Sequence, residues 1–183
     1  EAKTIGLGLM YGMGIAKLAA SLDIGPDEAK ALKKKYNDNV HFLNNIIIRA
    51  TRYTEQNGYI NTLLGRRCRF DLWESKDFHD KRMMSHENAK KTWQWNEMKR
   101  AGTYRALNRL IQGSAADQTK KAMVDLWKNV GVVPMIQIHD ELNISITNET
   151  QVKEIKEIME SAVELHVPVK CDAEIGNNWG EIK

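Results

Sequence analysis

The residues best suited to chemistry are three consecutive polar side chains, His139, Asp140 and Glu141, within an otherwise apolar stretch. Carboxylate oxygens are the ligands that Mg²⁺ and other hard cations prefer. The runs on either side alternate apolar and polar residues, a period of two that is typical of β-strands. Their apolar members are Ile136 and Ile138 in the first run and Leu142, Ile144 and Ile146 in the second. The pattern predicts a hairpin with one buried face and the three polar residues at or beside its turn. An ordinary surface turn is the alternative, because Asp is common in turns.

The composition indicates a soluble globular protein. The chain has 183 residues, of which 42% are hydrophobic and 28% are charged, enough for a real core. It contains no apolar run of membrane-spanning length and no signal peptide, so we expect no membrane partner and a cytoplasmic location, that of the host if the protein is viral. Cys68 and Cys171 are far apart, without metal-ligand spacing, as suits a reducing compartment. A net charge of +3 does not by itself indicate nucleic-acid binding.

The start of the chain is unusual. It begins at Glu1, without an initiator methionine, and directly in a helical pattern. We therefore expect a piece of a longer polypeptide: a processed chain, a split-gene product or a partial sequence.

The first helical pattern places three functional side chains on one face. Lys3, Leu7 and Tyr11 are spaced at i, i+4 and i+8, so they align along a helix. Gly6 and Gly8 interrupt this helix, and each costs about 1 kcal/mol relative to Ala. Such glycines indicate the close approach of a ligand or of another backbone.

Further helices are expected up to about residue 57. A break at residues 25–27, Gly-Pro-Asp, marks a stop and a restart, and Gly58 suits a helix C-cap. Residues 59–70 comprise a short extended run, a glycine turn and a basic cluster.

Residues 71–102 are rich in charge and in tryptophan. We predict a solvated helical excursion whose tryptophans pack back on the body of the protein. The alternative is a contact with nucleic acid, because bases stack on aromatic rings while cations meet phosphates. His79 and His86 have no partner at metal-ligand spacing and are predicted to lie on the surface.

The last part of the chain predicts a second layered unit. Residues 103–129 form a long helical pattern that we expect to pack beneath the hairpin, with Gly113 at a close contact. Residues 150–165 are amphipathic and predict another helix, and residues 167–175 predict a strand.

Five short motifs, in order along nearly the whole chain, resemble the C-terminal part of family A DNA polymerases, the DNA polymerase I type, in a phage or viral version. They are Lys3-Thr4-Ile5 with Tyr11-Gly12-Met13 (motif B), Gly58-Tyr59 with Thr62-Leu63 and Gly65-Arg66-Arg67, Asn108 with Gln112-Gly113-Ser114-Ala115-Ala116-Asp117, Ile138-His139-Asp140-Glu141 (motif C), and Gly176 with Asn178-Trp179. Each motif is weak alone, and their order and spacing together are specific.

The resemblance implies a helix-rich α+β fold, part of a right-hand polymerase. Residues 1–70 would be a fingers portion with the nucleotide-binding helix, residues 71–102 an insertion, and residues 103–183 a palm portion that carries the motif C hairpin on an antiparallel sheet.

The resemblance also implies template-directed DNA synthesis, in which dNTPs extend the 3′ end of a primer paired to a template. The family uses two Mg²⁺ ions. Asp140 would bind metal with Glu141 in support, and Lys3 would meet the triphosphate. Tyr11 would stack near the new base pair. Leu7 stands where relatives have Phe or Tyr against the sugar, so we expect altered discrimination at the sugar 3′ position.

Contacts with the primer–template are implied for five residues. Asn108 and Gln112 would touch the duplex, and His139 would approach the primer end. Arg66 and Arg67 suit the phosphate backbone, where contacts position the protein without specifying sequence.

The family's other catalytic Asp, in motif A, and its thumb have no counterpart in this chain. One carboxylate cluster cannot hold two Mg²⁺ ions in the family's geometry. We therefore expect the chain to be inactive alone and to need an N-terminal polymerase fragment that supplies motif A and the thumb, so that both ions are shared with residues not on this chain.

Two other functions are considered. A nucleic-acid-binding module without catalysis would carry the same contacts. A metal phosphohydrolase of the HD type could use His139-Asp140 with His86 and Asp172, but it would require helices around His-Asp.

Overall fold

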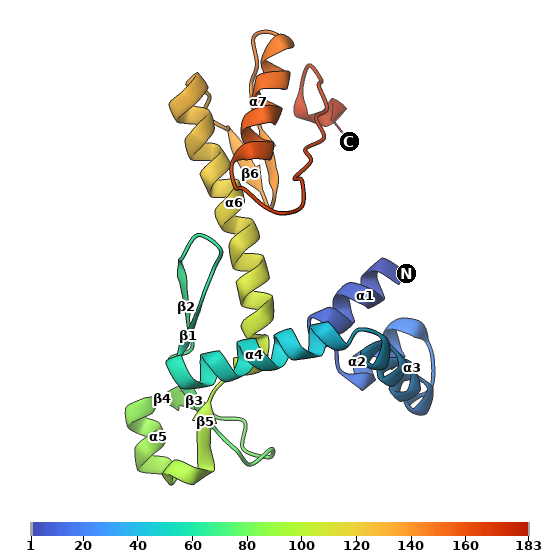
Figure 1. Cartoon of the computed structure of the whole chain (residues 1–183), viewed down its shortest axis with the longest axis vertical. Helices are drawn as coiled ribbons and strands as arrows, with labels where there is room; N and C mark the ends of the chain where they lie inside the picture. Colours follow the sequence, from blue (N-terminus) through green and yellow to red (C-terminus); the bar gives the residue numbers. More distant parts are fainter. Residues whose placement is uncertain (1, 183) are drawn as a thin grey trace. The chain divides into compact units, whose positions relative to one another are not determined.

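The computed structural model describes residues 2–182, with side chains from Ile5 to Ile182. Contacts divide the chain into two units, Glu1–Gln112 and Gly113–Lys183 (Figure 1). The predicted helix-rich α+β class is confirmed, because long helices accompany small antiparallel sheets. None of the described helices combines the length and the apolar character needed to cross a membrane.

The first unit begins with a series of helices: α1 (Ala2–Met10), α2 (Ile15–Leu22), α3 (Pro26–Asn39) and α4 (His41–Asn57). Pro26 occupies the first turn of α3, where its missing N–H leaves no bond unmade. Gly58 ends α4 with φ +77°, a left-handed conformation that favours glycine. Both predicted boundaries, the break at residues 25–27 and the C-cap, are confirmed.

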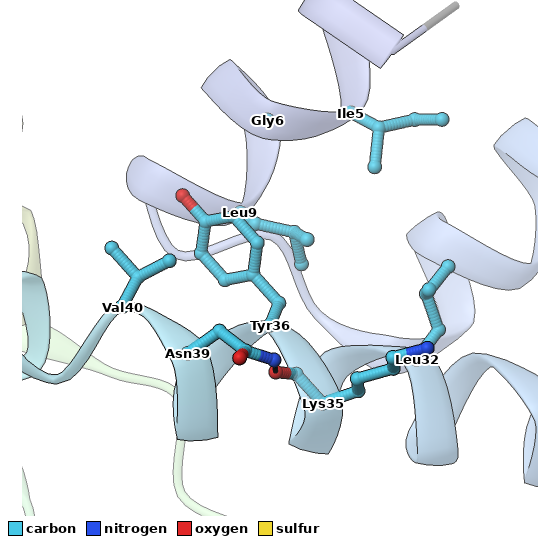
Figure 2. A pocket seen from close by; sticks show the side chains of 8 residues that line it. All are labelled: Ile5, Gly6, Leu9, Leu32, Lys35, Tyr36, Asn39 and Val40. Atoms are coloured by element: carbon cyan, nitrogen blue, oxygen red, sulfur yellow. Dashed lines mark hydrogen bonds between the residues drawn. The ribbon is translucent and has the colours of Figure 1, made fainter.

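A small apolar core fixes the buried face of α1. Leu9 packs with Leu18 and Ala19 of α2 and with Ala29 of α3. The same face of α1 borders a hollow of about 420 Å³ above α3, and Figure 2 shows the Tyr36 ring beneath α1, beside Leu9. The opposite, open face of α1 carries Leu7, which is 40% exposed.

The two glycines of α1 differ from expectation. A Cβ at Gly6 would meet nothing within 4 Å, so no close neighbour explains this glycine among the described residues. At Gly8 the close neighbour is the side chain of Met13, not a ligand or a backbone. The loop carrying Met13 is held by Lys33, whose Nζ donates to the Met13 carbonyl over 2.7 Å.

The basic cluster lies on a hairpin of β1 (Tyr59–Asn61) and β2 (Arg67–Arg69). Ile60 pairs with Cys68, and Ile60 forms a core with Phe70 and Ala106. The predicted extended run, glycine turn and basic cluster are therefore confirmed as one hairpin.

The prediction of a helical excursion for residues 71–102 is wrong. The segment forms an antiparallel sheet of β3 (Leu72–Ser75), β4 (Met83–Ser85) and β5 (Met98–Arg100), in the order β4-β3-β5, with a short α5 (His86–Thr92) and a 3-10 turn η1 (Trp95–Glu97). Asp77 and Asp80 explain the difference, because their carboxylates accept backbone N–H bonds from His79 and Arg82. Such local bonds favour turns over helix.

The aromatic side chains of this segment are arranged around Trp73. Trp73 is buried with Ala89 and Met98, whereas Trp95 is 67% exposed. The prediction that His86 lies on the surface is wrong: its ring stacks on Trp73 at a centroid distance of 4.6 Å, and its Nε2 is buried without a hydrogen-bond partner in the described part of the chain. His79 is exposed as predicted.

Arg100 joins three elements of the first unit. Its Nε donates to the carbonyl of Glu55 in α4 and its Nη1 to the carbonyl of Phe70 after β2, each over 3.2 Å. The guanidinium also lies over the Trp73 ring, 4.9 Å from its centroid. A Cβ at Gly58 would come within 2.8 Å of the Arg100 Cζ, so any other residue there would displace the guanidinium.

The predicted long helix is confirmed as a 3-10 turn η2 (Thr103–Arg105) that leads into α6 (Ala106–Val130). The second unit contains α6 from Gly113 onwards, then β6 (Ile136–Ile138), β7 (Glu141–Asn143), α7 (Thr150–Ser161) and the 3-10 turn η3 (Trp179–Glu181). Its buried apolar residues include Ala122, Leu126, Ile155, Ala162 and Val163.

The strand predicted for residues 167–175 is wrong. The segment pairs with no described strand, and Pro168 has no N–H to offer to one. Instead the Cys171 N–H donates to the Glu160 Oε1 over 2.9 Å. This bond lowers the pKa of the Glu160 carboxyl.

The Arg100 contact predicts different costs for two glycines that both have positive φ. Gly65→Ala should lower the free energy of unfolding by about 1 kcal/mol, the cost of a left-handed alanine alone, because a Cβ at Gly65 meets nothing within 4 Å. Gly58→Ala should lower it by about 2–3 kcal/mol, because the Arg100 guanidinium must also move. Urea denaturation of both variants measures the difference, and equal losses would contradict the proposed contact.

Candidate active site

His139 and Asp140 form a two-residue turn at the tip of the β6–β7 hairpin. Ile138 pairs with Glu141 across this turn. His139 has φ +54°, a left-handed conformation in which His, Asn and Asp are enriched among non-glycine residues. The Gln137 Nε2 donates to the His139 carbonyl over 2.9 Å and supports the turn. The prediction that these polar residues lie at or beside a hairpin turn is confirmed.

The hairpin does not have the single buried face that the alternation predicted. Ile138 pairs with Glu141 and Ile136 with Asn143, so both isoleucines share a face with polar partners. Leu142 pairs with Gln137 and points to the other face. Paired residues lie on the same face of a hairpin. Because a two-residue turn pairs residue 138 with residue 141, the even-numbered apolar residues of the two strands lie on opposite faces. Accordingly, Ile136 and Ile138 are 40% and 39% exposed.

Asp140 and Glu141 fit a magnesium site in part. Both side chains are exposed, and Mg²⁺ is commonly bound through one or two carboxylates together with substrate phosphates and water. The described residues contain no group of three His, Cys, Asp or Glu side chains able to hold a metal ion. The two carboxylates therefore suit part of a coordination shell.

Asn143 is a residue near this turn that the sequence reasoning missed. Its Nδ2 is buried and has no hydrogen-bond partner among the described atoms. Asn143 takes a polar position of the alternation, between Leu142 and Ile144, so no local sequence signal indicated its burial.

The predicted nucleotide-binding residues lie on and just after α1. Lys3 belongs to α1, but its side chain lies outside the described residues. Leu7 is 40% exposed on the open face. Tyr11 follows the last residue of α1, and its N–H still donates to the Leu7 carbonyl over 3.0 Å, so the helical spacing continues.

The structure brings together two of the predicted site residues within the first unit. The Gln112 Nε2 donates to the Tyr11 Oη over 3.2 Å. Gln112 and the half-buried Asn108 both lie on the first turns of α6. Tyr11, which is predicted to stack near the new base pair, is thus hydrogen-bonded to Gln112, which is predicted to contact the primer–template.

Arg66 and Arg67 are exposed at the start of β2. The Thr62 Oγ1 accepts the Arg66 N–H over 3.0 Å, and the Arg67 guanidinium lies 4.5 Å from the centroid of the Tyr59 ring. The turn is thus braced while the cationic groups remain accessible, as contacts to phosphate require.

Arg109, which the sequence reasoning did not select, braces the base of this hairpin. Its Nη1 donates to the Arg69 carbonyl over 2.9 Å, and its Cζ lies 4.5 Å from the centroid of the Phe70 ring. No local sequence pattern indicates this role, because the two partners lie about 40 residues earlier in the chain.

Comparisons with known proteins identify the family to which the chain is similar. The family model "DNA polymerase family A" matches residues 1–181. A DNA-directed DNA polymerase of Pseudomonas phage M6 is 33% identical over 214 residues, covering 98% of this chain and 29% of the phage protein. DNA polymerase I of Borreliella burgdorferi is 34% identical over 190 residues, covering 99% of this chain and 19% of that protein.

A solved structure is also similar, the POL domain of Pol1 from M. smegmatis in complex with DNA primer-template and dNTP. It matches with a TM-score of 0.68 at 28% identity and covers 92% of this chain and 28% of that chain. The chain thus spans less than a third of the length of each of these relatives.

The bracing role of Arg109 predicts a local effect. Arg109→Ala should lower the hydrogen-exchange protection of the Thr62 amide, which donates to the Arg66 carbonyl, by about tenfold, because the Arg69 carbonyl loses a charged donor. Arg105→Ala is the matched control, because its guanidinium lies over the exposed Tyr104 instead. Equal protection in the two variants would show that Arg109 does not brace the hairpin.

Proposed function

The chain belongs to DNA polymerase family A, and from this membership we propose that it is part of a template-directed DNA polymerase that adds deoxynucleotides to a primer 3′ end. The observation that carries the proposal is the family match over residues 1–181, which includes the exposed carboxylates of the β6–β7 turn. The phage and bacterial relatives that support it are named as DNA polymerases.

In this proposal Asp140 and Glu141 are donors to Mg²⁺. When bound, two such ions would supply the charge that favours deprotonation of the primer hydroxyl and stabilises pyrophosphate. The rigid two-residue turn supports the role, because it holds the Asp140 side chain at the end of a strand pair and not on a loose loop. His139, in the same turn, approaches the primer end.

The open face of α1 serves the incoming nucleotide. Lys3 offers a point charge to the triphosphate, and Leu7 contacts the sugar. Tyr11 stacks near the new base pair, and its bond to Gln112 couples this position to the start of α6.

The primer–template is contacted by the braced basic hairpin and by α6. Arg66 and Arg67 neutralise backbone phosphates, which position DNA irrespective of sequence. Asn108 and Gln112 touch the duplex.

We assign residues 1–70 to the fingers, residues 71–102 to an insertion and residues 103–183 to the palm. The separate core of Trp73, Ala89 and Met98 supports the insertion, because that segment packs around its own centre.

The 183-residue chain is proposed to be inactive alone. Its motif C turn offers two adjacent carboxylates, and two Mg²⁺ ions need further donors. A polymerase segment outside residues 1–183 that carries the motif A Asp and a thumb would supply them.

A DNA-binding module without catalysis is the second candidate, favoured by the exposure of Arg66 and Arg67 without a complete metal cluster among the described residues. The HD phosphohydrolase is not retained. His139 and Asp140 lie between strands, not between helices, and the described residues contain no metal cluster.

Primer extension tests the proposal. The chain should show Mg²⁺-dependent extension only when mixed with an N-terminal family A fragment that carries motif A and the thumb. Asp140→Asn should lower this activity by more than about a hundredfold, because even residues that support a metal ligand cost up to about a hundredfold. Asp172→Asn, an exposed carboxylate that the HD hypothesis would use, should leave it unchanged. DNA binding without extension in any mixture would favour the binding module.

The aliphatic Leu7 predicts a change in sugar discrimination. In the complemented enzyme, Leu7→Phe and Leu7→Tyr should change the ratio of dideoxynucleotide to deoxynucleotide incorporation, because each ring fills space beside the sugar 3′ position. Leu72→Phe, at a comparably exposed position in β3, is the control. Identical ratios in all the enzymes would remove Leu7 from the nucleotide site.

A further inference from the structure

A cavity in the first unit has no role in the proposed polymerase chemistry. Its volume is about 510 Å³, and it lies where α4 meets the sheet β4-β3-β5. Its lining combines the rings of Trp73, His86 and Trp95, the carboxylates of Glu55 and Asp71, and the side chains of Gln56 and Arg100.

The aromatic side of the cavity offers an accessible ring. Trp73 is covered by two neighbours, since His86 stacks on it at 4.6 Å and the Arg100 guanidinium lies over it at 4.9 Å. Trp95 packs against Trp73 at a centroid distance of 5.5 Å yet remains 67% exposed. A ligand can therefore stack on Trp95 while Trp73 holds that ring in place.

The two carboxylates of the cavity keep acceptor oxygens available. The Asp71 carboxylate has no hydrogen bond or ion pair with any described residue, and Glu55 receives a hydrogen bond on Oε1 only, from Thr103. The His86 Nε2 is buried without a partner, and a buried polar atom of this kind normally has one. Arg100 already donates to two backbone carbonyls.

The charge of the cavity decides the class of ligand. Two carboxylates and one guanidinium line the cavity, so its net negative charge attracts a cation and repels a phosphate group. A guanidinium group has five donors and no acceptor, and it stacks on aromatic faces. A nucleic-acid strand could place a base on Trp95, but its phosphates would have to pass the two carboxylates.

We propose that this cavity binds the guanidinium group of an arginine side chain presented by a partner protein. The guanidinium stacks on Trp95 and donates to the Asp71 and Glu55 carboxylates. The proposal does not depend on the polymerase function, because none of these residues belongs to the proposed catalytic or DNA-binding set.

A titration of the 183-residue chain with acetyl-Gly-Arg-Gly-amide tests the proposal. The indole N–H signal of Trp73 in a ¹H–¹⁵N spectrum is the readout, since it remains when Trp95 is changed. The peptide should shift this signal, and the matched peptide with citrulline, which has the same shape without the charge, should not.

Variants define the site. Asp71→Asn keeps the shape of the side chain and should weaken binding of the arginine peptide by about fivefold to tenfold. Trp95→Ala should weaken it at least as much. Trp127→Ala, at a similar exposure of 60% in the second unit, should not change it. If Trp95→Ala does not fold, Asp71→Asn still tests the site, because its own spectrum shows whether that variant is folded.

Three results would overturn the proposal. The first is no shift of the Trp73 signal by the arginine peptide at millimolar concentration. The second is an equal shift by the citrulline peptide. The third is a shift by a single-stranded oligodeoxynucleotide but not by the peptide, which would identify a nucleic-acid contact instead.

Discussion

The first unit depends on one guanidinium group. Arg100 bonds to carbonyls at the end of α4 and at the end of the basic hairpin, and it covers the central tryptophan of the small sheet. Three segments are thereby joined through a charged, directional contact. The contact is possible because position 58 is glycine, which both ends α4 and leaves room for the guanidinium. Arg109 makes a second contact of this kind, because its guanidinium lies over the Phe70 ring. The hairpin that carries Arg66 and Arg67 is thus oriented by arginines.

The β6–β7 hairpin of the second unit shows a different constraint. Its two-residue turn places Asp140 at the tip, and the same turn distributes the apolar residues over both faces. Ile136 and Ile138 are consequently exposed while Asn143 keeps a buried donor without a partner among the described residues. The two-residue turn that places the Asp140 carboxylate at the tip therefore does not give the hairpin a single apolar face. Under the proposed function, the role of the hairpin is to place Asp140 where it can bind a metal ion.

The features of the fold that depend on single residues and their neighbours could be predicted from the sequence. The C-cap at Gly58, the proline start at Pro26 and the turn at His139 follow from backbone preferences of single residues. The family followed from ordered short motifs and is confirmed by the match over residues 1–181. The sheet of residues 72–100 was missed, because its register depends on pairing between distant segments. The strand expected at residues 167–175 failed for the same reason, since a strand requires a neighbour as well as a pattern. The roles of Arg100 and Arg109 depend on partners 30 to 45 residues away.

The central claim is that the turn at Asp140 supplies part of a metal site, and paramagnetic relaxation tests it directly. Mn²⁺, which accepts the same oxygen ligands as Mg²⁺, is added to the ¹⁵N-labelled chain at substoichiometric concentration. We expect line broadening centred on the amides of His139, Asp140 and Glu141, and its loss in Asp140→Asn. Broadening centred elsewhere, or broadening at the turn that persists in Asp140→Asn, would contradict it.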